Sequence, residues 1–188
     1  MRCRSVDRRA FLLTMSGFSA LGYLESLTAL APPPRDELAE VRDNWRALLA
    51  SNVMISLSTD PVRKSRAEWQ KSLNRIQFAV LREEATEPPG SSPFNSEKRP
   101  GVYVCAGCLL PVFTSRMKYE SGTGWPSFFT SIPNHLGTKA DFRLPGEPRT
   151  EYHCIRCGGH QGHIFPDGPR PTNERWCNNG AALLFLPA

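Results

Sequence analysis

The sequence of 188 residues has no uninterrupted hydrophobic run of transmembrane length, no low-complexity tract and no strong excess of charge of one sign. The lack of a long hydrophobic run argues against a transmembrane helix. The net charge of +5 includes four arginines and two acids within the first 31 residues, so the rest of the chain has a net charge of only +3. Because that charge is small and scattered, nucleic-acid binding is not expected. The length suits one well-packed domain with extensions.

The N-terminal segment, residues 1–31, resembles a twin-arginine export signal. The pair Arg8-Arg9 precedes a mostly apolar stretch, and Ala29-Leu30-Ala31 resembles a cleavage site. Asp7 and Glu25 depart from that pattern, and they also count against a mitochondrial presequence, which is poor in acids. We therefore expect export to the periplasm or cell envelope. Membrane anchoring by an uncleaved signal is the alternative.

The remainder divides into a linker with a helical extension, residues 32–65, and a main domain, residues 66–188. Apolar residues recur at helical spacing in two runs, which predicts one helix over 38–49 and a second over 69–80. From Gly101 onward the pattern changes to short β-rich runs broken by glycine, proline and asparagine. These runs lie at 102–104, 150–153, 163–165 and 182–186. The predicted fold class is mainly β, largely antiparallel, with N-terminal helices.

Four of the six cysteines form two C-x-x-C pairs. The pairs are Cys105 with Cys108 and Cys154 with Cys157. Each pair places two sulfurs on a tight knuckle, and paired knuckles are typical of a tetrahedral zinc site. Four thiolates close the coordination shell, so the zinc ion is expected to be structural. A redox-active C-x-x-C or an iron–sulfur cluster is the alternative, and both fit the spacing less well.

Cys177 is the one remaining thiol once the N-terminal segment with Cys3 is set aside. In the strand predicted around it, Arg175, Cys177 and Asn179 alternate onto one face. A neighbouring guanidinium lowers the pKa of a thiol and makes the sulfur a nucleophile near neutral pH. The alternative is an inert buried cysteine, and the strand pattern alone does not decide between a nucleophilic and an inert Cys177.

Three further residues could serve the same site. His160 and His163 closely follow the second knuckle and could donate a proton at physiological pH. Trp125 lies in a turn-forming stretch, where its indole face could hold a methyl-sulfur group with a gain of about 0.3–1.5 kcal/mol. Taken singly, each of the three is better explained as a structural residue.

Four motifs occur together and in order. They are C-A-G-C, K-Y-E-S-G-T-G-W-P-S-F, R-T-E-Y-H-C-I-R-C-G-G-H-Q-G-H-I-F-P-D-G-P-R-P-T and R-W-C-N-N-G. From about residue 67 to residue 186 the chain therefore resembles the methionine-R-sulfoxide reductase family, type B. The resemblance implies two antiparallel β-sheets with flanking N-terminal helices, held together by zinc at the four paired cysteines.

The same resemblance implies the roles of seven residues. The matching positions are Cys177 for the nucleophile, His160, His163 and Asn179 for the polar groups that bind and protonate the sulfoxide oxygen, Trp125 for the wall against the methyl group, and Arg175 and Asp167 for a charged pair near the nucleophile. The thiolate would attack the sulfoxide sulfur, methionine would depart, and a sulfenic acid would remain for another thiol to reduce. Because the sulfoxide sulfur is chiral, one pocket is expected to serve one epimer.

Recycling of the enzyme is where the chain departs from many family members, which have a resolving cysteine where this chain has Thr123. We therefore expect direct reduction of the sulfenic acid by a thioredoxin-like protein or a small thiol. Cys3 is a distant candidate resolver if the signal is retained. The expected substrates are oxidised proteins or peptides containing methionine-R-sulfoxide, and the chain is expected to act as a monomer.

Two other interpretations of the sequence compete with the reductase. A zinc-ribbon module that binds without catalysis explains the four paired cysteines but leaves Cys177 and the histidines without a purpose. A general thiol oxidoreductase would need a resolving partner near Cys177, which the sequence does not supply.

Overall fold

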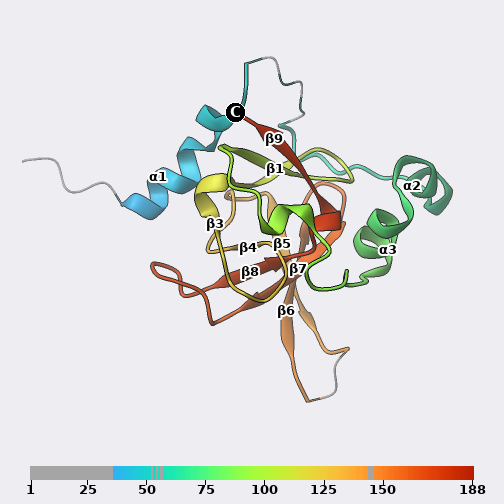
Figure 1. The fold of residues 1–188 in the computed structure, drawn as a ribbon. Helices are drawn as coiled ribbons and strands as arrows, with labels where there is room; N and C mark the ends of the chain where they lie inside the picture. Colours follow the sequence, from blue (N-terminus) through green and yellow to red (C-terminus); the bar gives the residue numbers. More distant parts are fainter. Residues whose placement is uncertain (1–35, 52, 54, 56, 144–145) are drawn as a thin grey trace, which may run out of the picture. The chain divides into compact units, whose positions relative to one another are not determined.

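The computed structural model describes residues 36–51, 53, 55, 57–143 and 146–188. Short helices come first along this part of the chain and strands follow (Figure 1). The predicted signal lies outside the described residues, and the predicted boundary between extension and main domain stays a prediction. Within the described ranges, every helix is too short or too polar to cross a membrane.

The helices are α1 (Glu37–Asp43), α2 (Arg66–Ser72) and α3 (Arg75–Glu83). A 3-10 helix, Asn44–Leu48, continues α1, so the helix predicted over 38–49 is confirmed as two joined pieces. The single helix predicted over 69–80 is wrong, because the chain is extended at Leu73 and restarts at Asn74. The Asn74 side chain accepts a hydrogen bond from the Gln77 backbone, and Gln77 reaches back to the Asn74 backbone. This capping box starts a new helix where apolar periodicity alone indicates continuity.

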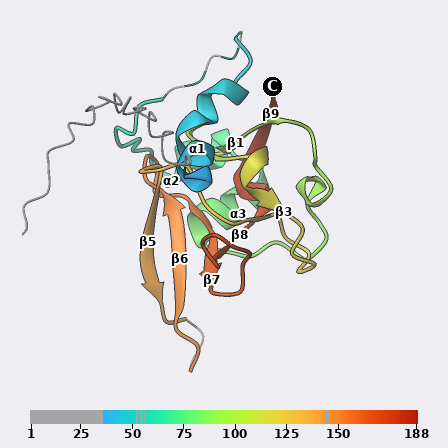
Figure 2. The same cartoon turned by 90° about the vertical axis from the view of Figure 1, so that its left-hand side faces the viewer.

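In the part of the chain that the structure describes, nine strands form two antiparallel sheets, which confirms the predicted fold class. The smaller sheet has the order β2 (Pro111–Thr114), β1 (Gly101–Cys105), β9 (Leu183–Pro187). The larger sheet has the order β3 (Lys118–Tyr119), β4 (Ser127–Phe128), β8 (Arg175–Asn178), β7 (His160–Phe165), β6 (Arg149–Cys154), β5 (Leu136–Asp141). The four predicted β runs correspond to β1, β6, β7 and β9, whereas β2 to β5 were not predicted. Figure 2 shows the long hairpin of β5 and β6 from the side.

Aromatic side chains fill the core between the two sheets. Phe113 of the smaller sheet stacks on Phe128 of the larger one with 4.0 Å between ring centroids. Tyr103 and Tyr152 meet these rings edge-on, and all four side chains are buried. Such aromatic pairs add about 0.5–1.5 kcal/mol each beyond the burial of their area. The strand that contains Cys177 is therefore held in the middle of the larger sheet by a rigid core.

Three 3-10 turns complete the described part of the chain: Pro93–Asn95, Ser115–Met117 and Gly180–Ala182. The last of these directly follows β8, and α3 packs both on it and on β7. The helix α3 thus supports β7 and the turn that comes after β8, two elements next to the site described below.

Candidate active site

The four paired cysteines form two knuckles of matching backbone geometry. In the first, the Leu109 N–H donates to the Cys105 carbonyl at 2.8 Å, and in the second the Gly158 N–H donates to the Cys154 carbonyl at the same distance. Leu109 and Gly158 hold equivalent positions and both have positive φ, 61° and 67°. Glycine adopts that conformation readily and leucine does not, so the fold imposes it on Leu109.

The knuckles bring the four sulfurs into one cluster, with all Sγ atoms within 4.8 Å of one another. The Cys105–Cys157 and Cys108–Cys154 sulfur pairs are 3.6 Å and 3.5 Å apart. A disulfide requires about 2.05 Å, whereas tetrahedral zinc–sulfur bonds of about 2.3 Å place the sulfurs roughly 3.8 Å apart. The cluster therefore fits a tetrahedral metal ion with four thiolate ligands, and its distances are not those of a disulfide.

The cysteine cluster is joined directly to strand β7. The Gln161 amide donates to the Cys105 sulfur at 3.4 Å, and an Arg82 guanidinium of α3 donates to the Cys157 carbonyl at 2.8 Å. Gly159 leads from the second knuckle into β7, and a Cβ there would lie 2.8 Å from the Leu81 side chain. The cluster thus fixes the start of the strand that bears both histidines.

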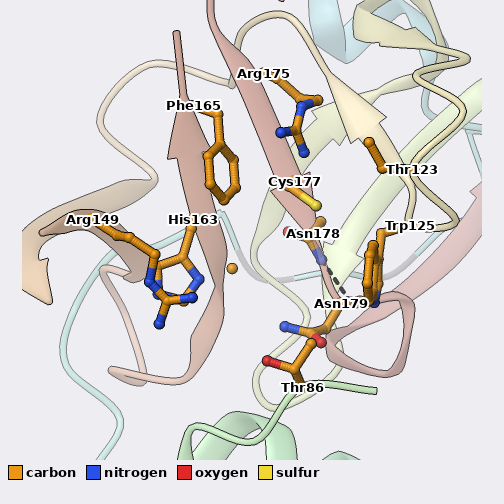
Figure 3. A pocket seen from close by; sticks show the side chains of 11 residues that line it. Thr86, Thr123, Trp125, Arg149, His163, Phe165, Arg175, Cys177, Asn178 and Asn179 are labelled. Atoms are coloured by element: carbon orange, nitrogen blue, oxygen red, sulfur yellow. Dashed lines mark hydrogen bonds between the residues drawn. The ribbon is translucent and has the colours of Figure 1, made fainter. Parts of the chain in front are cut away.

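Cys177 opens into a cavity of about 260 Å³ on the larger sheet (Figure 3). The cavity is lined by Thr86, Thr123, Trp125, Arg149, Gly162, His163, Phe165, Arg175, Cys177, Asn178 and Asn179. In Figure 3, Cys177 lies between Trp125 and Thr123 on one side and Phe165 and His163 on the other. A thiol, two aromatic walls and a few polar groups therefore share one concave site.

Five of the seven residues expected at the site line this cavity, and the other two lie behind or beside it. The lining residues are Cys177, His163, Asn179, Trp125 and Arg175. Asp167 lies at the rim with its side chain 59% exposed, where it is bonded to Arg175 at 2.8 Å and 2.9 Å. His160 is buried behind His163, with 5.3 Å between the ring centroids.

The surroundings of Cys177 have opposing effects on the pKa of its thiol. Burial raises the pKa of Cys177 above the ordinary thiol value, whereas the Arg175 guanidinium and the Thr123 hydroxyl lower it. Burial is the larger effect, so the expectation that Arg175 gives a thiolate near neutral pH is wrong for the free protein. The sequence shows the neighbouring cation, but it does not show how far the sulfur is removed from water.

Asn179 and Trp125 are both held by Glu87, a residue that the sequence pattern marks only as the end of a helical run. The Glu87 backbone N–H donates to the Asn179 side-chain oxygen at 3.0 Å, and its carbonyl accepts from the Trp125 indole N–H at 3.0 Å. The buried Glu87 carboxylate accepts from the backbone N–H groups of Gly180 and Ala181. One residue far away in sequence therefore sets the positions of a polar group and an aromatic wall.

The two histidines each face a carboxylate and are both neutral near pH 7. His163 Nε2 lies 2.8 Å from Asp141 Oδ2, and His160 Nδ1 lies 2.8 Å from Glu151 Oε1. Burial is the main cause that lowers the pKa of both rings, and for His160 the pKa falls to about 4. A neutral imidazole offers one N–H donor and one lone pair, so the carboxylate partner decides which nitrogen donates.

Sequence reasoning missed three functional features of the cavity. Arg149 and Phe165 lie inside quoted motifs without an assigned role, and Thr86 gives no signal because it precedes a proline pair at the end of a helix. Arg149 is bonded to the same Asp141 that holds His163, at 2.6 Å. Phe165 packs under the Arg175 guanidinium at 4.3 Å from the ring centroid. Alternation along β7 could have identified Phe165, since it follows His163 by two positions.

Comparison with known proteins agrees with this geometry. The SelR domain model matches residues 73–187, so the chain belongs to the SelR domain family. Similar curated proteins include the peptide methionine sulfoxide reductase MsrB of Bradyrhizobium diazoefficiens, with 48% identity over 129 residues, 68% of this chain and 92% of that protein. The chloroplastic peptide methionine sulfoxide reductase B1 of Arabidopsis thaliana is 44% identical over 181 residues, 96% of this chain and 79% of that protein. The human mitochondrial methionine-R-sulfoxide reductase B2 is 45% identical over 140 residues, 70% and 76% of the two chains.

Proposed function

We propose that this chain is a peptide-methionine (R)-S-oxide reductase in which Cys177 is the nucleophile. The observation that supports this most strongly is the Cys177 thiol inside a cavity that combines aromatic walls with polar groups, in a member of the SelR domain family. A methionine side chain needs such a mixed site, because its methyl and methylene groups are apolar and its sulfoxide oxygen is polar. The substrates are proteins and peptides that contain methionine sulfoxide.

In the proposed reaction the Cys177 sulfur attacks the sulfoxide sulfur and the sulfur–oxygen bond of the substrate breaks. The oxygen ends on Cys177 as a sulfenic acid, and the methionine thioether leaves. The substrate sulfur gains two electrons and the cysteine sulfur loses two. The proton of the thiol balances the proton of the sulfenic hydroxyl, so the overall step consumes no further proton. The raised pKa of Cys177 is consistent with a thiol that keeps this proton until substrate binds.

The remaining residues would bind the substrate and polarise its oxygen. Asn179, His163 and, through His163, His160 form the polar side of the site, and Trp125 holds the methyl group. Arg175, held in place by Asp167, would stabilise negative charge on the Cys177 sulfur during attack. Because the sulfoxide sulfur is chiral, only one epimer can present its oxygen to the polar side while its methyl group contacts the indole.

Recycling of Cys177 requires a thiol from outside this site. Among the described residues, every cysteine other than Cys177 belongs to the four-sulfur cluster. Thr123, at the position where many family members have a resolving cysteine, lines the cavity with a hydroxyl in place of a thiol. A thioredoxin-like protein or a small thiol would condense with the sulfenic acid, releasing water, and a second thiol would then free Cys177. Cys3 lies outside the described residues. A Cys3–Cys177 disulfide after one turnover would contradict this scheme.

We further propose that the four-cysteine cluster holds a structural zinc ion through Cys105, Cys108, Cys154 and Cys157. With four thiolate ligands the ion would have no open position for water, so it would cross-link the two knuckles and take no part in the reaction. The sulfur spacing and the shared backbone geometry of the knuckles support this assignment.

Export remains part of the proposal, with residues 1–31 as a twin-arginine-type signal that is cleaved or kept as an anchor. The twin-arginine route would suit a protein that must fold around its metal before transport. The chain would then repair methionines in the cell envelope as a monomer. N-terminal sequencing of the protein from the envelope fraction tests this, and a protein found only in the cytoplasm with its first 31 residues intact would contradict it.

The decisive test of the activity is turnover of a peptide containing methionine-R-sulfoxide against its S epimer, with dithiothreitol as reductant. We expect reduction of the R epimer alone, and loss of at least ~1,000-fold in the Cys177→Ser variant because the nucleophile is gone. A zinc-loaded wild-type protein that reduces neither epimer would contradict the proposal. That outcome would favour the alternative, a zinc-ribbon module that binds without catalysis.

A further inference from the structure

A buried carboxylate lies behind the two histidines and has no role in the function proposed above. The side chain of Glu151 in β6 is 1% exposed, with one oxygen 2.8 Å from His160 Nδ1 and the other 2.8 Å from Lys139 Nζ. A buried charge without partners costs several kcal/mol. The imidazole and the ammonium group that contact its two oxygens offset part of the cost of burying Glu151.

Glu151 belongs to a chain of ion pairs that runs from one histidine round to the other. Its links are Lys139 to Glu84 at 2.7 Å, Glu84 to Arg143 at 2.7 Å, Arg143 to Asp141 at 3.2 Å, and Asp141 to both Arg149 at 2.6 Å and His163 at 2.8 Å. Three carboxylates thus face three cations, contributed by the end of α3, by β5 and the segment after it, and by β6. Each histidine contacts a carboxylate whose charge is balanced by its neighbours.

The contact with Glu151 determines the tautomer of His160. An ionised carboxylate can only accept hydrogen bonds, so the proton of the neutral ring must be on Nδ1. The other nitrogen, Nε2, then carries the lone pair, and it is buried without a protein partner. The ring also packs edge-on against His163, which lines the cavity. A His160 ring of fixed orientation therefore supports His163 on the side that faces away from the cavity.

We propose that Glu151, with Lys139 behind it, is a positioning residue of the reductase: it holds His160 as the Nδ1–H tautomer in a fixed orientation, and His163, which Asp141 bonds, packs against that ring in the cavity. This inference rests on the function proposed above for the cavity. It gives a purpose to a buried carboxylate that neither belongs to the cysteine cluster nor lines the cavity. A carboxylate that accepts a hydrogen bond from one ring nitrogen of a histidine fixes which nitrogen is protonated and how the ring is oriented.

The test uses the purified full chain with its metal and measures two properties of Glu151→Gln. The first is the tautomer of His160 near pH 7, obtained from its ring nitrogen chemical shifts and assigned with His160→Gln. The second is the single-turnover rate of sulfenic acid formation, together with KM for the R-sulfoxide peptide. We expect a mixed or reversed tautomer, a rate at least ~10-fold lower, and a much smaller change in KM.

Glu84→Gln is the matched control, because it removes a carboxylate of the same ionic network that contacts neither histidine. It is expected to keep the Nδ1–H tautomer, which separates a specific effect on His160 from general loss of the network. Wild-type His160 with its proton on Nε2 would overturn the inference, and so would a Glu151→Gln protein with wild-type rate. The wild-type tautomer alone decides the matter if Glu151→Gln does not fold. A wild-type chain that reduces neither epimer refutes the proposed function, while the tautomer measurement still tests the role of Glu151.

Discussion

The four knuckle cysteines and Cys177 are the same residue type in two environments. Each knuckle sulfur has three others within 4.8 Å and lies on a turn whose geometry its partner turn repeats. Cys177 instead has a guanidinium, a hydroxyl and an open cavity as neighbours. Thiol chemistry follows from such surroundings, since grouped thiolates bind metal while a single accessible thiol beside a cation can attack a substrate.

The two environments are also mechanically connected. Gln161 contacts a knuckle sulfur with its side chain, and its backbone carbonyl accepts from the Asn179 side chain at 3.0 Å. Strand β7 then continues to His163 in the cavity, paired directly with Cys177 of β8. The four-cysteine cluster is thus a support from which residues of the candidate active site extend, and disturbing it should affect both regions.

The largest expected effect is a loss of zinc and of stability when the cluster is disrupted by Cys154→Ser. Loss of one thiolate ligand should release the zinc ion and lower the free energy of unfolding by more than ~5 kcal/mol, because metal binding is coupled to folding. Zinc content and chemical denaturation measure both quantities. Cys177→Ser, which removes a partly buried sulfur outside the cluster, should keep its zinc and its stability. Equal stability of the two variants would show that the cluster does not support the fold.

A smaller effect is expected from Arg175→Met, which removes the cation that opposes burial at Cys177. The pKa of the thiol should rise further, so the alkylation of Cys177 by iodoacetamide should reach its midpoint at a higher pH. A rise of one pKa unit would lower the thiolate fraction, and hence alkylation near pH 7, by about tenfold.

The control for this change is Arg99→Met, since Arg99 is an exposed arginine that pairs with Glu97 in the segment before β1. Its alkylation profile should match that of the wild type. If Arg175→Met leaves the midpoint where it was, Arg175 does not act on the thiol and its contact with Asp167 serves only the fold.

The smallest effect is expected from Thr123→Cys, which places a second thiol beside Cys177. After one turnover the sulfenic acid should condense with the new thiol to give an intramolecular disulfide, because both residues line the same cavity. Thiol counting and peptide mapping after reaction with the R-sulfoxide peptide measure this. Thr138→Cys, at an exposed position on β5, should form no such bond. A Thr123→Cys protein that retains both free thiols would show that the cavity does not let the two sulfurs meet.

The sequence predicted much of the site because its chemistry depends on residue type and close spacing. The cysteine pairs indicated the cluster, and alternation around Cys177 placed Arg175 beside it on β8. The position of His160 and the role of Glu87 could not be predicted in this way. Both depend on contacts between residues far apart in the chain, Glu87 with Asn179 across 92 positions in particular.

Local pattern by itself thus indicated the fold class and the candidate metal ligands, because knuckles and strand alternation act over a few residues. The family motifs then singled out Cys177 as the candidate nucleophile. The tertiary structure decided three other matters: the break between α2 and α3, the protonation of Cys177 and the separation of the two histidines. Each of these depends on burial or on a distant partner. Cys177 has the same sequence neighbours in the unfolded chain, but only folding removes its sulfur from water and sets that effect against the charge of Arg175.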